Sequence, residues 1–195
     1  MINIDVLRAI KERRSVHTFK KEEVADEIIH EIFTYGSWAP THYMKEPWKI
    51  KLFQEKGKTG FIQAIIRSYQ RIGFIKKDQK PKTLKMIDSM TDFLSVIPHH
   101  ALIYFDKEAD PVRQEEEYAA VSAFIQNIQL AGWAYGVGML WTITPYMHDP
   151  AFAREIGLNS EEIKIAAVMQ IGYPKTIAKT KGRTPIEDKL EIIRT

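Results

Sequence analysis

The sequence predicts an α+β fold contained in one domain that covers residues 1–195. Predicted helices precede and separate strands of unequal length, with neither a regular β-α-β alternation nor an internal repeat. Hydrophobic residues make up 45% of the chain and charged residues 27%, which is ordinary for a globular protein. A chain of 195 residues is long enough for one substantial core, and no linker-like stretch divides it.

The first half of the chain changes several times between helix and strand patterns. Apolar spacing predicts a helix with one buried face over residues 3–13, and a second helix over 26–35 that ends at Gly36. The apolar face of the first helix consists of Ile4, Leu7 and Ile10. Apolar and cationic residues alternate over 48–53, which is typical of a half-buried strand. Residues 58–95 are expected to be helical but interrupted. The expected breaks are Gly57, Gly60, Gly73 and Pro81.

The second half of the chain contains the strongest helix signal. Asp110 can cap a helix, Pro111 suits the first turn, and apolar residues then recur until Gly136. Several alanines along this helix would let neighbouring elements approach it, so we expect it to be packed on more than one side. Apolar runs predict the remaining elements, namely strands over 101–105, 139–143 and 165–171 and a short helix over 150–157.

The segment from Tyr173 onward is basic and has no core stripe of its own. Apolar residues near its end favour docking on another surface over disorder, and a partner chain is the surface that we expect. These residues are Ile186, Leu190, Ile192 and Ile193.

Composition excludes several kinds of function. The chain contains no cysteine, which excludes disulfides, thiolate metal sites and cysteine nucleophiles. No apolar run approaches the roughly 20 residues of a membrane-spanning helix. The first five residues lack the basic and apolar regions of a signal peptide. We therefore expect a cytoplasmic protein without a membrane partner.

A cluster of basic residues raises the alternative of nucleic-acid binding. Its members are Arg67, Arg71, Lys76, Lys77, Lys80, Lys82 and Lys85. The formal net charge is only +3 and few aromatic residues lie between the cations, so we expect a solvated helical face and no nucleic-acid partner. The adjacent His99 and His100 should point to opposite faces of a strand and cannot readily share one ion, so no metal site is predicted.

The run from Arg13 to His17 is the most informative stretch of the chain. It places two arginines, a serine and a histidine at the end of the first predicted helix. A helix C-terminus carries partial negative charge, so an anion there must be held by side chains. Guanidinium groups bind phosphate through two parallel hydrogen bonds. A solvated, basic helix end is the alternative interpretation of this run when it is taken alone.

Four segments of the chain resemble the FMN-dependent nitroreductase family, in the order that the family shows. Residues 13–19 resemble its phosphate motif, and residues 39–48 resemble its second flavin loop, which ends in Pro-Trp. Residues 131–141 resemble the passage from helix to strand beside the flavin. Residues 171–174, followed by 181–183, resemble the closing strand and second basic cluster. The resemblance covers essentially the whole chain.

The resemblance implies a mostly antiparallel central sheet flanked by helices, and a homodimer in which a C-terminal arm is exchanged. It also implies an FMN site at the dimer interface, and NAD(P)H as the electron donor. The residues implied to bind FMN are Arg13, Arg14, Ser15, His17, Thr41, His42, Glu46, Trp141, Thr142, Ile143, Lys181 and Arg183. No residue is implied to be catalytic, because the flavin itself carries the chemistry.

The implied roles differ among these residues. Residues 13–15 would hold the ribityl phosphate and the pyrimidine edge, with residues 41–46 supplied by the other subunit. His17 stands where a second cation is usual in the family. Glu46 stands where an amide is usual, and a carboxylate can accept a hydrogen bond but not donate one. For Trp141, core packing is the alternative role.

The resemblance implies an oxidoreductase that reduces nitroaromatic or quinone-like acceptors by two-electron, ping-pong hydride transfer through flavin N5. The alternative is a flavin-binding carrier, sensor or flavin-processing protein on the same fold, without nitroreductase turnover. Neither the natural acceptor nor the choice between NADH and NADPH follows from the sequence, although the basic cluster is compatible with the extra phosphate of NADPH.

Overall fold

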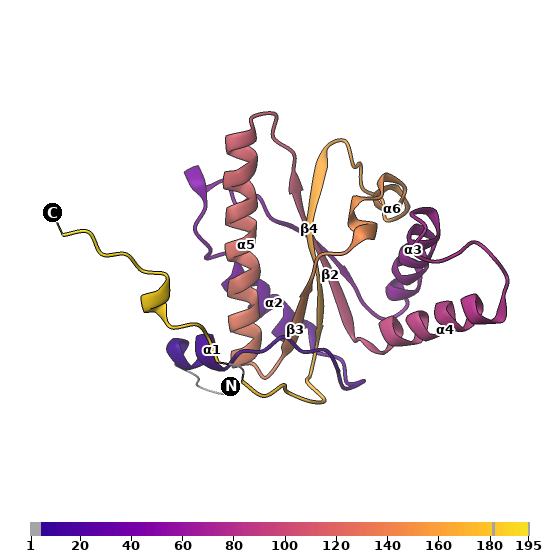
Figure 1. Cartoon of the computed structure of the whole chain (residues 1–195), viewed down its shortest axis with the longest axis horizontal. Coiled ribbons are helices and arrows are strands. Elements are labelled where there is room, and N and C mark those ends of the chain that lie inside the picture. Colours follow the sequence, from indigo (N-terminus) through magenta and orange to yellow (C-terminus); the bar gives the residue numbers. More distant parts are fainter. Residues whose placement is uncertain (1–4, 181, 195) are drawn as a thin grey trace.

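The computed structural model describes residues 5–180 and 182–194, which contain a four-stranded antiparallel sheet (Figure 1). The strand order is β1-β2-β4-β3. The strands are β1 (Lys49–Phe53), β2 (His99–Asp106), β3 (Gly138–Thr142) and β4 (Ile163–Gly172). The predicted α+β class with an antiparallel sheet is confirmed. Ile4 and Lys181, which two of the predictions include, lie outside the described residues.

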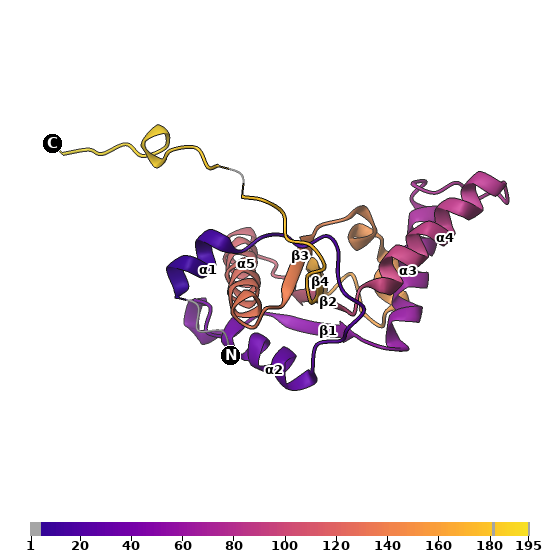
Figure 2. The same ribbon diagram turned by 90° about the horizontal axis from the view of Figure 1, so that it is seen from below.

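Helices cover both faces of this sheet. They are α1 (Val6–Glu12), α2 (Asp26–Gly36), α3 (Gly57–Arg71), α4 (Pro81–Val96), α5 (Pro111–Ala134) and α6 (Pro150–Glu155). The described residues also form short 3-10 helices, namely η1 (His42–Met44), η2 (Pro145–His148) and η3 (Ile186–Asp188). Helices α1, α2 and α5 lie on one side of the sheet, and α3, α4 and α6 lie on the other (Figures 1 and 2).

The two central strands are buried on both faces, which explains their continuous apolar sequence. In β2, Ala101, Ile103 and Phe105 belong to the core beneath α2 and α5. The intervening Leu102 belongs to a second core, which it shares with Phe61 of α3 and with residues of α6. Side chains that alternate between two helical layers leave no polar face on the strand.

Helix α5 is the main support of the first layer. The Asp110 side chain accepts a hydrogen bond from the Val112 N–H at 2.9 Å, as expected for a capping residue. Phe124 of α5 stacks on Trp48 with a centroid distance of 5.1 Å. The helix also contacts α1, α2 and three of the strands, so the expected packing on more than one side is confirmed.

The segment that follows α1 lies against the ends of β3 and β4. The Val16 N–H donates to the Met139 carbonyl at 3.1 Å, and the Lys20 N–H donates to the Tyr173 carbonyl at 2.9 Å. Gly138 permits this approach, because a Cβ atom built there would lie 2.4 Å from Cγ2 of Val16. This contact fixes where the Arg13–His17 run is presented.

Two sequence expectations for the helices are wrong. The predicted apolar face of α1 is not buried within the chain: Leu7 is 70% exposed and Ile10 is also exposed, whereas Ala9 is buried. Helix α1 lies at the periphery of the molecule (Figure 2) and packs on α5. The small Ala9 is buried, and the large apolar side chains of the helix are left uncovered. Gly60 does not interrupt α3, which continues to Arg71 because its apolar face packs on the second core.

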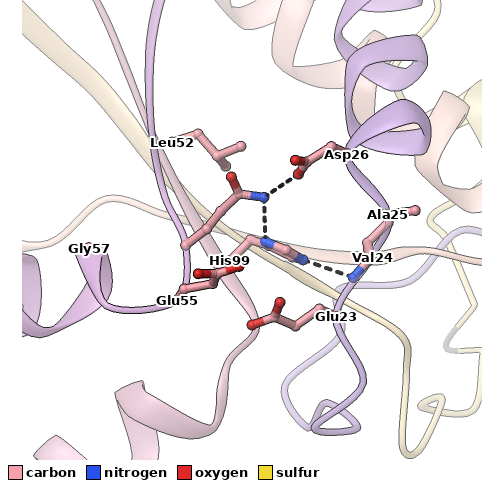
Figure 3. A pocket seen from close by; sticks show the side chains of 9 residues that line it. Glu23, Val24, Ala25, Asp26, Leu52, Glu55, Gly57 and His99 are labelled. Atoms are coloured by element: carbon pink, nitrogen blue, oxygen red, sulfur yellow. Dashed lines mark hydrogen bonds between the residues drawn. The ribbon is translucent and has the colours of Figure 1, made fainter.

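The adjacent histidines of β2 point to opposite faces, as predicted. His99 Nε2 accepts the Val24 N–H at 2.9 Å, beside a pocket that also contains Gln54 (Figure 3). His100 lies on the other face against Phe61, with its Nε2 3.0 Å from the Leu94 carbonyl. Burial lowers the pKa of His100 to about 4, so the ring is neutral near pH 7 and donates to Leu94.

The close approach at Gly138 makes a stability prediction. We expect Gly138→Ala to lower the free energy of unfolding by about 1–3 kcal/mol, because the new methyl group overlaps Val16. Gly60→Ala is the matched control: nothing lies near its Cβ position, and loss of a helical glycine should stabilise by about 0.5–1 kcal/mol. Chemical denaturation measures both. Equal stability of Gly138→Ala and wild type would show that the contact is loose.

The burial of His100 makes a prediction about pH. The unfolded chain takes up a proton near the ordinary pKa of 6.5, whereas the folded protein resists protonation until about 4. Stability is therefore complete above this window and is lost as the pH falls through it. Between pH 7 and pH 5 the loss from this group is about 2 kcal/mol. In His100→Gln, denaturation curves should lose that part of the pH dependence. His30→Gln on the exposed side of α2 should keep it.

Candidate functional site

Three arginines meet at a cleft between α1 and the C-terminal segment. The cleft, called the arginine cleft below, has a volume of about 940 Å³. It is lined by Ile10, Lys11, Arg13, Arg14, Ser15, His17, Ala178, Lys179, Thr180, Gly182 and Arg183. Five of the twelve residues predicted to bind FMN are therefore brought to one place: Arg13, Arg14, Ser15, His17 and Arg183.

Arg13 is the most constrained cation of the arginine cleft. Its Nη1 donates to Oε1 of Gln129 on α5 at 3.1 Å, while its Nε is buried and has no hydrogen-bond partner in the described structure. Burial, together with the charges of Arg14 and Arg183, lowers the pKa of Arg13. A half-buried guanidinium that faces two other cations and retains an unused donor is suited to bind an anion such as phosphate.

Arg14 fixes the position of the cleft relative to the backbone. Its Nη1 donates to the carbonyls of Lys11 and Arg13 at 2.8 and 2.7 Å, which are groups at the C-terminal end of α1. Its Nη2 donates to the Thr180 hydroxyl in the C-terminal segment. Arg14 thus ties α1 to residues far along the chain. Ser15 and His17 are exposed beside it.

The second predicted group, residues 41–46, forms a loop anchored to the N-terminal half of α5. His42 Nδ1 lies 3.1 Å from Oε2 of Glu116. The Lys45 ammonium pairs with Glu108 and, at 2.8 Å, with the buried Glu117. The hydrogen bonds that Lys45 donates to these two carboxylates raise the pKa of Lys45. The loop is therefore held by ion pairs on more than one side.

The same loop has an unfavourable backbone conformation. Tyr43, Met44 and Glu46 have φ values of 50°, 56° and 47°, a region that costs non-glycine residues about 1–3 kcal/mol each. The Thr41 hydroxyl accepts the Glu46 N–H at 3.1 Å and helps to hold the turn. Tyr43 is 91% exposed and Met44 is 78% exposed. Tyr43 stacks on His42 with a centroid distance of 4.2 Å, yet the large side chains of Tyr43 and Met44 are left largely exposed, which indicates a contact surface.

The third predicted group lies at the end of the edge strand β3. Backbone groups of every second residue in a strand point to the same side, so Trp141 faces the outer edge as Met139 does. The Trp141 ring packs against the core beneath α5, and its Nε1–H is buried without a partner in the described structure. The Thr142 hydroxyl instead donates to the Val168 carbonyl at 2.8 Å, and Ile143 is exposed just beyond the strand.

Comparison with known proteins identifies the family that this arrangement represents. Residues 10–173 match the family model described as the Nitroreductase family. The chain belongs to the nitroreductase family. The match contains the Arg13–His17 run, the 41–46 loop and strand β3, and it ends as the C-terminal segment begins.

Individual nitroreductase relatives cover nearly the whole chain. YfhC of Bacillus subtilis, provisionally named an NAD(P)H nitroreductase, is 32% identical over 92% of this chain and 90% of its own length. The solved nitroreductase-like protein of Bacillus cereus has a TM-score of 0.87 and 30% identity, and covers 99% of this chain and 98% of its own. A provisional nitroreductase of Desulfovibrio desulfuricans, solved with FMN, has a TM-score of 0.74 and 21% identity, with 99% coverage of both chains.

This nitroreductase chain does not bring all the predicted site residues together. Arg13 is attached to α5 at Gln129, and His42 is attached at Glu116. These attachment points are 13 positions apart, or about 20 Å along a helix. The 41–46 loop and the arginine cleft thus lie at opposite ends of α5 (Figure 1).

The structure adds residues that the sequence prediction missed. The cleft also contains Lys11 and Thr180, and Gln129 supports Arg13 from α5. Gln129 had only a weak signal, since it is a polar residue between Ile128 and Leu130 but follows the polar Gln126 and Asn127. No local sequence pattern indicates the role of Thr180, because its partner Arg14 is 166 positions away in the sequence.

A separate acidic pocket of about 610 Å³ lies beside His99 and was not predicted (Figure 3). It is lined by the carboxylates of Glu23, Asp26 and Glu55. Over residues 5–180 and 182–194, no group of three or more His, Cys, Asp or Glu side chains is arranged to hold a metal ion. Within the same residues, no helix has both the length and the apolar character needed to cross a membrane.

Proposed function

We propose that this protein is an FMN-dependent NAD(P)H oxidoreductase whose residues 1–195 act as one FMN-binding domain. The observation that carries the proposal is the arginine cleft, where Arg13, Arg14 and Arg183 converge and a buried guanidinium nitrogen has no partner. A phosphate monoester supplies the charge and the acceptor oxygens that this donor set requires. The family membership supports the same assignment.

The cleft residues would hold the phosphate end of FMN. Arg13, Arg14 and Arg183 would supply the charge, and the Ser15 hydroxyl would supply a neutral donor. His17 would add a ring N–H donor. Lys181, outside the described residues, would add a further cation.

The remaining residues would act on the ring of the flavin. When bound, FMN would supply the two-electron chemistry that links NAD(P)H to a nitroaromatic or quinone-like acceptor in two separate half-reactions. The backbone of Trp141 faces the outer edge of β3, and its N–H would be available to donate to the ring of bound FMN. Thr142 and Ile143 would complete this wall, and no side chain of this chain needs to act as a nucleophile.

The functional unit in this proposal is a homodimer with FMN at the interface. One subunit would supply the arginine cleft and its partner would supply Thr41, His42 and Glu46, which are about 20 Å away within a single chain. Uncovered apolar residues support this assembly. They are Leu7 and Ile10 on α1, Tyr43 and Met44 in the loop, and Ile186, Leu190, Ile192 and Ile193 in the C-terminal arm.

The absorbance spectrum of the purified protein, before and after anaerobic NADPH, tests the proposal. We expect the visible bands of an oxidised flavin, their bleaching by NADPH, and their return when a quinone or nitroarene is added. Bands that resist both NADH and NADPH would favour the flavin-binding carrier, sensor or processing protein instead. A colourless protein that takes up no added FMN would contradict both functions.

Arg14→Gln should weaken FMN binding about ten- to hundredfold, because one charge-assisted contact is lost. Fluorescence titration of the apoprotein with FMN measures the change. Arg8→Gln is the matched control, since this arginine pairs with Glu12 on the exposed face of the same helix and lies outside the cleft.

Mixing two defective variants tests whether the site is shared between subunits. We expect an Arg14→Gln protein and a His42→Ala/Glu46→Ala protein each to bind FMN weakly as homodimers. After subunit exchange, each heterodimer should regain one intact site, because one subunit keeps the native cleft and the other keeps the native loop. If both groups served the same chain, every site would keep one defect and mixing would restore nothing.

A further inference from the structure

A second positively charged hollow lies at the start of α4, away from the arginine cleft. This lysine cradle has a volume of about 510 Å³ and is lined by Phe74, Lys76, Asp78, Lys80, Lys82, Thr83, Lys85, Met86 and Ser89. Helix α4 and the loop before it project from the body of the molecule on the far side of the sheet from α1 (Figures 1 and 2).

The cradle is lined by four lysines and one carboxylate, Asp78, so its cations are in excess. In the described structure, none of the ammonium groups of Lys76, Lys80, Lys82 and Lys85 forms an ion pair. Two other members of the same basic cluster are paired, since Arg67 contacts Glu155, and Arg71 contacts both Glu155 and Asp149. The expected solvated face therefore divides into a paired part on α3 and an unpaired part around the cradle.

The one carboxylate that lines the cradle is engaged by the backbone. Oδ1 of Asp78 accepts the Lys80 N–H at 3.2 Å, just before α4 begins. Pro81 has no N–H, and the N–H groups of Thr83 and Leu84 donate to the Lys80 carbonyl at 2.9 and 3.1 Å, so among the described first-turn donors the Lys82 N–H is left for an external acceptor. The ammonium groups, with this one N–H beside them, favour a ligand with several anionic oxygens.

An apolar wall accompanies these cations. Phe74 is 57% exposed and packs one side on Tyr69, with a centroid distance of 4.7 Å. Met86 is 41% exposed and lines the same hollow. A free phosphate would leave this wall uncovered, whereas a ligand with a planar aromatic part and a phosphate would use both features.

We propose that the lysine cradle binds a phosphorylated nucleoside, with its base against Phe74 and Met86 and its phosphate among Lys76, Lys80, Lys82 and Lys85. Two sources supply this chemistry: the 2′-phosphoadenosine end of NADPH, in which case the inference rests on the proposed function, and a free nucleotide. The cradle contains none of the residues assigned to FMN, so the two sites can be tested separately.

Calorimetric titration of the FMN-saturated protein tests this inference, with adenosine 2′,5′-bisphosphate and ATP as probes. We expect binding of at least one probe that weakens as salt is added. The Lys82→Ala/Lys85→Ala variant should bind that probe at least about tenfold more weakly, because two charge-assisted contacts are lost. Lys77→Ala is the matched control, since Lys77 is an exposed lysine of the same loop that does not line the cradle.

Steady-state kinetics then distinguish the two sources. If the cradle holds the end of NADPH, the double variant raises KM for NADPH about tenfold and leaves KM for NADH unchanged. If it holds a free nucleotide, ATP binding is lost in the double variant while both KM values stay the same. If neither probe binds, or the double variant binds like Lys77→Ala, the inference is wrong even when NADPH bleaches the flavin. Failure of bleaching with intact probe binding would overturn only the proposed function.

Discussion

The hydrogen bond from the Val16 N–H to the Met139 carbonyl is the contact on which the arrangement of the arginine cleft depends. It fastens the segment after α1 to the edge strand β3, so the residues just before Val16 are presented beside the C-terminal segment. Gly138 makes the contact possible, because any larger residue would occupy the space of the Val16 side chain. Backbone pairing thus places the two arginines next to this contact, and their side chains are then held by Gln129, Thr180 and the carbonyls at the end of α1.

Most elements of the fold follow from local sequence patterns. Asp110 and Pro111 mark the start of α5 within one residue, because capping and a fixed φ angle are properties of single residues. The alternation over residues 48–53 likewise predicts β1, because side chains of a strand take turns between its faces. The Arg13–His17 run can also be recognised locally. An anion beside a helix C-terminus must be held by side chains, and the run supplies suitable donors at that position.

The features that the sequence could not predict depend on distant parts of the chain. Leu7 and Ile10 have the spacing of a buried helix face, yet periodicity does not say which surface covers that face. Gln129 and Thr180 meet Arg13 and Arg14 only after the chain has folded, across separations of 116 and 166 residues. The left-handed backbone at Tyr43 and Met44 occurs without a glycine that would indicate it, beside a lysine whose ion-pair partners, Glu108 and Glu117, are distant in the sequence.

The separation of the loop from the cleft along α5 has a consequence for how the proposed dimer responds to its concentration. A site assembled from two chains couples cofactor occupancy to the association equilibrium by mass action. Dilution would release cofactor and subunits together, and saturating cofactor would in turn draw subunits into the dimer. A newly synthesised chain would thus have no complete FMN site until a second copy is present. The supply of flavin in the cell would then help to set how much of the protein is dimeric.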